Sequence, residues 1–192
     1  MRTQEQKRGQ GQGRLSVVAT PIGNLEDVTL RALRTLKEAD TILCEDTRVT
    51  SKLLSRYEIR TPTLSFHSHS GKAKFDKILE RLHEGKHLAL VTDAGTPAIS
   101  DPGGELVAHV RTISPETLIE VIPGPSALTA ALSLAGLKTR EFVFYGFLPH
   151  KKGRETLLKR IAGDMRASVF YESTHRIMKT LEALRELLPS RR

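Results

Sequence analysis

The sequence VTDAGTPAISDPGG, from Val91 to Gly104, is predicted to form neither a regular helix nor a strand. It holds three glycines, two prolines and two aspartates, which is the composition of a loop. A buried-strand pattern precedes it at His87–Val91, and a helical pattern follows at Glu105–Ile113. Open α/β sheets bind ligands at such connections beyond the carboxyl ends of their strands. The stretch therefore predicts a ligand-binding loop, in which Asp93 and Asp101 favour hydroxyl, amine or adenine groups over a bare polyphosphate.

Strand and helix patterns alternate on both sides of this loop. Short β-rich runs predict strands, with periodic helical runs between them, at residues 15–19, 41–44, 63–66, 87–91 and 118–122. This alternation predicts a mostly parallel sheet covered by helices on both faces. Beyond a boundary near 136–141, the patterns predict strands at 142–145 and 167–171 and helices at 154–161 and 174–188.

The predicted fold class is therefore α/β, with a parallel-sheet N-terminal domain over residues 15–138 and a second, smaller α/β domain over 139–192. Residues 1–14 are rich in Gln, Gly and basic side chains, and Met1 is their one apolar residue. Such a segment cannot bury enough apolar surface to fold, so we expect a disordered basic tail.

Composition narrows the function classes. No run approaches the roughly 18 apolar residues of a membrane span, and the N-terminus lacks a signal-peptide core, so a cytoplasmic protein without a membrane partner is expected. The single cysteine, Cys44, excludes an internal disulfide framework. The net charge of +8 and the pI near 9.8 favour a polyanionic partner such as RNA, although basic side chains also serve simply to keep a surface soluble.

Four loops follow predicted strands and would emerge together at the carboxyl edge of one parallel sheet, which predicts a binding cleft. They are TPIGN (20–24), EDTR (45–48), DAGTPAISDPG (93–103) and PGPSA (123–127). The chain has no GxGxxG after its first strand, no GxxxxGK[ST] and no GxSxG elbow. His67 and His69 have no third ligand at metal-binding spacing, so no metal site is predicted.

These loops occur in order with ATPIGNLEDVTLRAL (19–33), YGFLP (145–149) and FYESTHR (170–176). Over about Leu15–Leu188 the combination resembles the ribosomal RNA small subunit methyltransferase I family. Members are tetrapyrrole-methylase-like, class III S-adenosylmethionine-dependent methyltransferases. The resemblance implies two domains with the cofactor in the cleft between them, and a homodimer. It also implies methylation of the ribose 2′-oxygen of a decoding-centre cytidine in 16S rRNA of the small ribosomal subunit.

The resemblance further implies which residues hold S-adenosylmethionine. Pro21 would sit beside the methyl-donor end, and the other implied cofactor-binding residues are Asp93, Ala94, Gly95, Thr96, Ile99, Ser126, Ala127, Phe170, Tyr171 and Glu172. The chemistry agrees, because backbone groups of glycine-rich loops and apolar walls suit a sulfonium, an amino-acid head, a ribose and an adenine.

Direct displacement at the methyl carbon depends on positioning and on a base for the hydroxyl proton. Glu45, Asp46 and His67 are the candidate bases. Arg48 could hold an RNA phosphate, as could Lys72 and Lys74. For the two acids of EDTR, helix capping is the alternative role.

Two other functions stay open. Members of the resembled family continue past the last helix with a strand bearing an AREL-TK-like motif and further strands, so the second domain is expected to be incomplete here. A non-catalytic RNA-binding remnant is therefore one alternative. The other is a tetrapyrrole C-methyltransferase of corrin or sirohaem synthesis, although that branch resembles VGAGPG in its first loop and this chain has ATPIGN.

Overall fold

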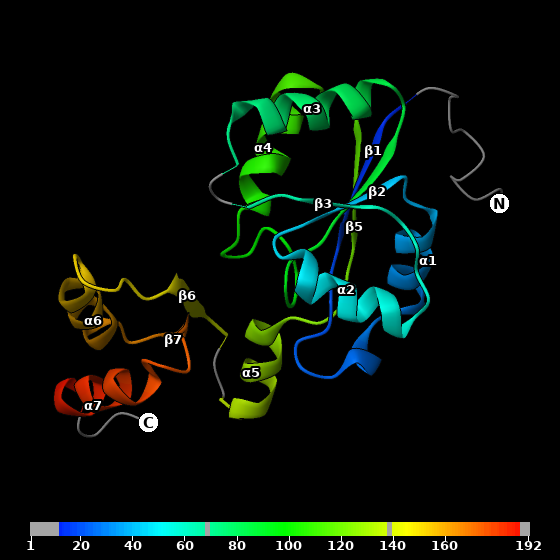
Figure 1. Ribbon diagram of the computed structural model, residues 1–192. Coiled ribbons are helices and arrows are strands. Elements are labelled where there is room, and N and C mark those ends of the chain that lie inside the picture. Colours follow the sequence, from blue (N-terminus) through cyan, green and yellow to red (C-terminus); the bar gives the residue numbers. More distant parts are fainter. Residues whose placement is uncertain (1–11, 68–69, 138–139, 189–192) are drawn as a thin grey trace. The chain divides into compact units, whose positions relative to one another are not determined.

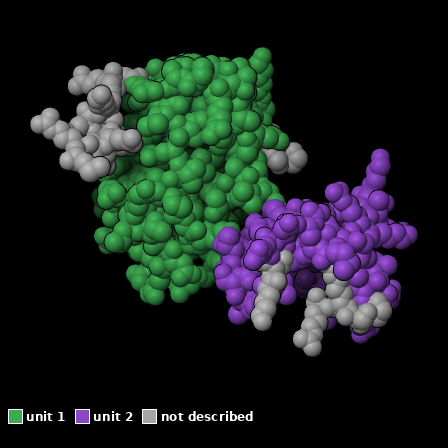
Figure 2. Space-filling model, turned by 180° about the vertical axis from the view of Figure 1, so that it is seen from behind, with its two compact units in different colours: residues 1–127 green, residues 128–192 purple. Residues whose placement is uncertain are grey.

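The computed structural model describes residues 12–67, 70–137 and 140–188 (Figure 1). By its internal contacts the chain divides into two compact units, residues 1–127 and 128–192 (Figure 2). Within the described ranges, no helix is both long enough and apolar enough to span a bilayer.

The first unit is built on a five-stranded sheet in which every strand pairing is parallel. The strand order is β3-β2-β4-β1-β5, with β1 at Arg14–Val18, β2 at Thr41–Cys44, β3 at Thr63–Ser65, β4 at His87–Leu90 and β5 at Leu118–Ile122. In β1, Val17 pairs with Leu90 on one side and Val121 on the other. Parallel neighbours need crossover connections, and the helical segments between the strands supply them. The predicted α/β class with a parallel sheet is confirmed.

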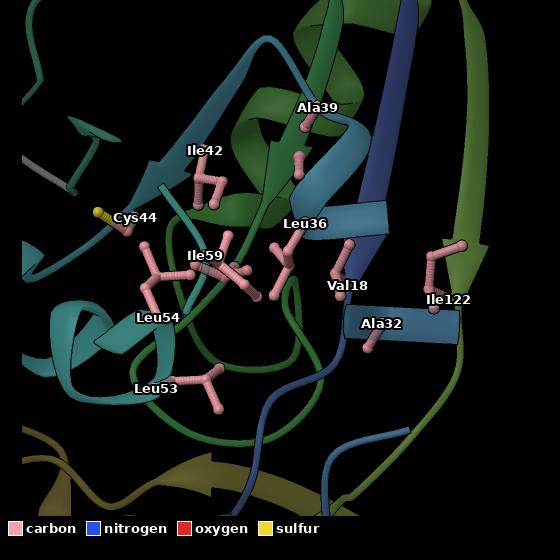
Figure 3. Packing of buried hydrophobic residues seen from close by; sticks show 12 residues of the cluster. Val18, Ala32, Leu36, Ala39, Ile42, Cys44, Leu53, Leu54, Ile59 and Ile122 are labelled. Carbon is pink, nitrogen blue, oxygen red and sulfur yellow. The ribbon is translucent and has the colours of Figure 1, made fainter. Parts of the chain in front are cut away.

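Helices cover both faces of this sheet (Figure 1). The helices are α1 at Leu30–Glu38 and α2 at Thr47–Arg56 on one face, and α3 at Lys72–His83 and α4 at Gly103–Ile113 on the other. On the first face Leu36 and Leu53 belong to one apolar cluster with Ile42 and Cys44 (Figure 3). Leu43, between those two strand residues, belongs to the cluster of the opposite face. Burial on both faces explains the continuous apolar runs of the central strands.

Two further helical elements follow strands of the first unit. The 3-10 helix η2 at Leu25–Asp27 follows β1, and α5 at Ala127–Ala135 follows β5 and crosses the division between the units. Thr29 caps α1 by accepting the N–H of Ala32 at 3.0 Å. The sequence allows either Asp27 or Thr29 in this role, and the structure uses Thr29.

Beyond α5, the second unit contains a parallel pair of strands and two helices. These are β6 at Phe142–Phe147, α6 at Arg154–Gly163, β7 at Ala167–Tyr171 and α7 at Ile177–Leu187. Leu148, Leu158 and Ile161 form its buried cluster.

Several element ends differ from the sequence expectation. β1 begins at Arg14, inside the segment predicted as tail, while residues 1–11 lie outside the described residues. β6 continues past Tyr145 through an irregular register at Gly146, whose φ of +65° a glycine adopts without cost. α7 begins at Ile177, later than predicted. His69 and the predicted domain boundary after residue 138 also lie outside the described residues, and that boundary stays a prediction.

Candidate active site

The four loops singled out in the sequence lie at the same edge of the first unit's sheet. They follow β1, β2, β4 and β5, and all of these strands run parallel. We call residues 20–24, 45–48, 93–103 and 123–127 the carboxyl-edge cluster. The parallel topology therefore brings together what the sequence separates by up to about a hundred residues.

Hydrogen bonds tie the loop after β1 to the loop after β4. The backbone N–H of Thr20 donates to the carbonyl of Gly95 at 2.9 Å, and the N–H of Gly95 donates back to Thr20 at 3.0 Å. The Thr20 hydroxyl also donates to the carbonyl of Thr92 at 3.1 Å. Gly95 has a φ of +88°, which L side chains rarely adopt, so this junction explains the glycine of DAGTP.

The loop after β4 also contacts the two remaining loops. The Thr96 hydroxyl donates to the carbonyl of Pro125 at 3.1 Å. Asp93 accepts the backbone N–H of Asp46 on its Oδ1 at 3.1 Å. The DAGTP loop is thus hydrogen-bonded to all three other members of the carboxyl-edge cluster.

Asp101 has a role that the sequence did not reveal. Its Oδ1 accepts the N–H groups of Ala98 at 2.9 Å and of Gly103 at 2.7 Å. Ala98 and Ser100 have φ values of +72° and +66°, so the turn is strained for residues with side chains. The Asp101 carboxylate therefore stabilises the turn before α4. The sequence predicted that it would accept hydrogen bonds from a ligand.

Within EDTR, the two acids differ sharply. Asp46 caps α2 by accepting the N–H of Arg48 at 2.8 Å, and the guanidinium of Arg48 donates to its Oδ2 at 2.7 Å. Those hydrogen bonds lower the pKa of Asp46 to about 2, which makes it a poor proton acceptor near neutral pH. The capping role weighed for this residue is the one the geometry shows.

Of the two acids of EDTR, Glu45 is the better candidate for a base. Burial raises the pKa of Glu45 above its ordinary value, and the charges of Asp93 and Asp101 raise it further. His67, after β3, lies near enough for its charge to oppose that rise. Its backbone N–H donates to the Ser70 hydroxyl at 3.0 Å. A half-buried carboxylate with a raised pKa suits proton abstraction.

The other residues predicted for the cofactor fall in both units. In the first, Ala94, Ile99 and Ala127 are exposed at the carboxyl edge, Ser126 is half-buried, and Pro21 is buried. In the second, Phe170 and Tyr171 are half-buried residues of β7. Among the described residues, no group of three His, Cys, Asp or Glu side chains could hold a metal ion.

Glu172 has a structural partnership that the FYES motif did not indicate. Its side chain is 1% exposed, and it accepts hydrogen bonds from Arg154 at 3.1 Å and from Thr180 at 2.7 Å. It also forms an ion pair with Arg176, whose Nη2 lies 2.6 Å from the Glu172 Oε1. Burial raises the pKa of Glu172, but these bonds and the Ser173 N–H outweigh it and hold the pKa below its usual range. This carboxylate joins β7 to α6 and α7, and a role at the cofactor stays a prediction.

A pocket that the sequence did not indicate lies beside the cluster. It has a volume of about 110 Å³ and lies between the first loop, the start of α2 and the loop after β4. The lining residues are Thr20, Pro21, Leu25, Val49, Thr50, Lys52, Leu53, Thr92 and Asp93. The periodic pattern of α2 predicted only core positions, because a single helix does not show which loops will meet it.

The relationship to known proteins agrees with this architecture. The sequence model of the tetrapyrrole (corrin/porphyrin) methylases matches residues 14–192. The chain belongs to this methylase family. Within it, the chain is 48% identical over 179 residues to the ribosomal RNA small subunit methyltransferase I of Thermotoga maritima, covering 93% of this chain and 80% of that protein. It is 47% identical to the protein of the same name from Escherichia coli O157:H7, covering 93% of this chain.

The chain spans 62% of the Escherichia coli relative and 61% of the Bacillus subtilis relative, which is less than two thirds of each. Solved structures of other proteins share its fold. Uroporphyrin-III C-methyltransferase from Thermus thermophilus, complexed with S-adenyl homocysteine, gives a TM-score of 0.62 at 24% identity, covering 94% of this chain and 74% of that one. Diphthine synthase gives a TM-score of 0.67 at 15% sequence identity, and the match covers 91% of this chain and 71% of that one.

Proposed function

We propose that this chain transfers a methyl group from S-adenosylmethionine to the ribose 2′-oxygen of a nucleotide in small-subunit ribosomal RNA. The observation that carries the proposal is the carboxyl-edge cluster, in which four loops of one sheet edge are hydrogen-bonded around DAGTP. Relatives 45–48% identical over most of the chain bear the name of an rRNA methyltransferase. The target that we assign is the decoding-centre cytidine 1402 of 16S rRNA.

The residues at the carboxyl edge fit the proposed cofactor. Gly95 leaves space beside Ile22, since a Cβ there would meet the Ile22 Cγ2 at 3.5 Å and no other side chain within 4 Å. Exposed Ala94, Ile99 and Ala127 offer apolar contact, and backbone groups of the loops offer donors and acceptors. Asp93 supplies a carboxylate for an ammonium group. In the second unit, Phe170, Tyr171 and Glu172 complete the proposed set.

When bound, S-adenosylmethionine would supply an activated methyl group, whose bond to sulfur would break as the neutral thioether S-adenosylhomocysteine leaves. Glu45 accepts the proton of the 2′-hydroxyl as the new oxygen–carbon bond forms, so that no charged alkoxide has to persist. The hydrogen-bonded loops hold their residues in fixed places, which favours the in-line arrangement that displacement requires. Arg48, Lys72 and Lys74 carry positive charge for RNA phosphates, and His67 lies beside the base.

The proposal includes the setting of the reaction. The substrate is 16S rRNA within the small ribosomal subunit, the enzyme is a homodimer, and the location is the cytoplasm. The net charge of +8 supports a polyanionic substrate.

Methyl transfer from tritiated S-adenosylmethionine tests the proposal. Purified small subunits that lack the modification are offered in one reaction and uroporphyrinogen III in another. We expect label in the ribosomal RNA alone, at a ribose 2′-oxygen. Label in the tetrapyrrole alone would establish the tetrapyrrole alternative. No label in either, with RNA still bound, would establish the non-catalytic remnant.

A further inference from the structure

The second unit has a carboxyl edge of its own, where β6 and β7 end (Figure 1). These two strands pair in parallel, so the segments that follow them emerge at the same edge. The loop after β6 covers residues 148–153 (LPHKKG), and Arg154 then begins α6. The loop after β7 covers residues 172–176 (ESTHR), and Ile177 then begins α7. We call them the β6 loop and the β7 loop, and the proposed function assigns only Glu172 within them.

Hydrogen bonds join the β6 loop to the β7 loop. The guanidinium of Arg176, in the β7 loop, donates to the carbonyl of Leu148 at 3.3 Å. The guanidinium of Arg154 donates to the carbonyl of Pro149 at 3.1 Å and to the Glu172 carboxylate at 3.1 Å. Glu172 also forms its ion pair with Arg176. These bonds fix the two loops beside each other, so both present their exposed side chains at one edge of the second unit.

The network beneath the loops leaves positive charge in excess. The guanidinium groups of Arg154 and Arg176 share the single carboxylate of Glu172. The two arginine side chains are only 17% and 21% exposed, so water screens the remaining charge incompletely. Charge held away from water is unfavourable unless an opposite charge compensates it. An anion at the surface of these loops would supply that compensation.

The exposed side chains of the loops add to the same positive charge. The exposed basic side chains are His150, Lys151, Lys152 and His175. Neither lysine forms an ion pair with another residue of the described ranges. The acid that follows the β6 loop, Glu155, is already paired with Lys159 at 2.6 Å. The two lysine charges are therefore available to a ligand.

We propose that the β6 and β7 loops bind a backbone phosphate of the RNA substrate, with the ammonium groups of Lys151 and Lys152 as its donors. This inference rests on the proposed function, because RNA is the polyanion on which that function acts. Cationic side chains that meet a phosphate fix the position of the nucleic acid and read no base. The contact therefore adds affinity and places the RNA strand, without selecting a sequence. The carboxylate of the cofactor is the other anion in the proposed reaction, and the experiment below separates the two.

The salt dependence of RNA binding tests the inference without requiring turnover. Fluorescence anisotropy follows a short fluorescein-labelled single-stranded RNA, bound to the full chain between about 50 and 200 mM KCl. Lys151→Gln/Lys152→Gln should weaken binding about fivefold or more. It should also reduce the slope of log affinity against log salt concentration by about 1.4, because each single-strand phosphate contact contributes about 0.7.

A matched double variant separates this site from the net charge of the chain. Arg160 and Arg185 are exposed and lie in the last turns of α6 and α7, the helices that begin at the two loops. Arg160→Gln/Arg185→Gln removes the same charge and should change the salt slope by less than about 0.5. A selective loss in the lysine variant supports the inference. Equal changes in both variants, or no change in the lysine variant, would overturn it.

Calorimetry with S-adenosylmethionine identifies which anion the loops bind. Cofactor affinity that is unchanged in the lysine variant supports an RNA phosphate. Cofactor affinity that falls as far as RNA affinity would assign the loops to the cofactor carboxylate and overturn the inference. Methyl transfer to small subunits tests the proposed function separately. Absent transfer by the unmodified chain contradicts that function, whereas a selective loss of RNA binding in the lysine variant supports the phosphate site even then.

Discussion

Gly95 joins two loops of the carboxyl-edge cluster, and its backbone conformation is the reason that a glycine stands there. Both its N–H and its carbonyl bond Thr20, and its φ is +88°. An added Cβ would find space, because its nearest neighbour would be Ile22 at 3.5 Å. The loss of stability on substitution of Gly95 therefore comes from its left-handed backbone conformation and not from a steric clash of the added side chain. A side chain at this position would therefore strain the junction between the two loops.

Gly95→Ala should lower the free energy of unfolding by about 1–2 kcal/mol, the cost of a left-handed conformation for a residue with a side chain. Urea denaturation measures this. Gly104→Ala is the matched control in the following helix, where the added Cβ makes only an ordinary contact at 3.6 Å. The control should be neutral or stabilising by up to about 1 kcal/mol. Equal destabilisation in both variants would contradict the explanation.

Glu45 is the residue that we propose as the base for the 2′-hydroxyl proton. Its raised pKa means that the carboxylate takes up a proton at a higher pH than an ordinary glutamate does. A base acts only when deprotonated, so the methyl-transfer rate should fall as the pH drops through that pKa. Glu45→Gln should lower the rate about 10²- to 10⁴-fold and remove this acidic limb. A rate–pH profile measured from pH 5 to 9 checks it, and an unchanged acidic limb in the variant would assign the base elsewhere.

At the scale of the elements, a polar network joins the three strands β4, β1 and β5 at their amino-terminal half. His87 Nδ1 lies 2.6 Å from Arg14 Nη2, and its Nε2 lies 2.8 Å from the Ser16 hydroxyl. That hydroxyl donates to Glu120 at 2.7 Å. A neutral His87 that accepts from the guanidinium and donates to Ser16 satisfies every member of this chain.

The network should make stability depend on pH. Burial lowers the pKa of His87 and the charge of Arg14 lowers it further, while Glu120, Asp40 and a hydrogen bond to the Glu38 backbone oppose the shift. In the unfolded chain the pKa of histidine is about 6.5, so the unfolded state binds the proton first as the pH falls. The stabilisation is therefore present above about pH 6.5 and declines below it until the folded-state pKa is reached.

Urea unfolding of the unmodified chain between pH 8 and 5 measures this decline. His87→Gln lacks the titrating ring, so its stability should vary less with pH across that interval, even if it is lower throughout. A variant slope as steep as that of the unmodified chain would show that other groups cause the decline.

The local sequence pattern predicts individual helices, strands and caps. Strands, helices and the caps Thr29 and Asp46 follow from short-range periodicity and from side chains that bond nearby N–H groups. The order of the strands does not, because any order of parallel strands satisfies the same apolar runs. The bonds of Gly95 to Thr20 and of Asp93 to Asp46 depend on β4 lying between β1 and β2. The pocket depends on that order as well, because its lining comes from the loops after β1 and β4 and from α2.

For the whole molecule, the first unit carries the carboxyl-edge cluster, the favoured base and the pocket. Motif order was sufficient to predict the fold class and the family, because several short motifs in sequence are more specific than any one of them. It was not sufficient for the ion pairs of Glu172 with Arg154 and Arg176, because the FYES motif does not show which side chains the folded chain brings to this carboxylate. Long-range packing decides between those roles.

The central claim is that the carboxyl-edge cluster binds S-adenosylmethionine. Calorimetric titration of the cofactor into the unmodified chain and into Gly95→Ala tests it most directly. We expect one molecule bound per chain, with affinity weakened at least about tenfold in the variant, a loss of about 1.4 kcal/mol. Absence of binding to the unmodified chain at millimolar cofactor, or equal affinity in the two proteins, would contradict the account.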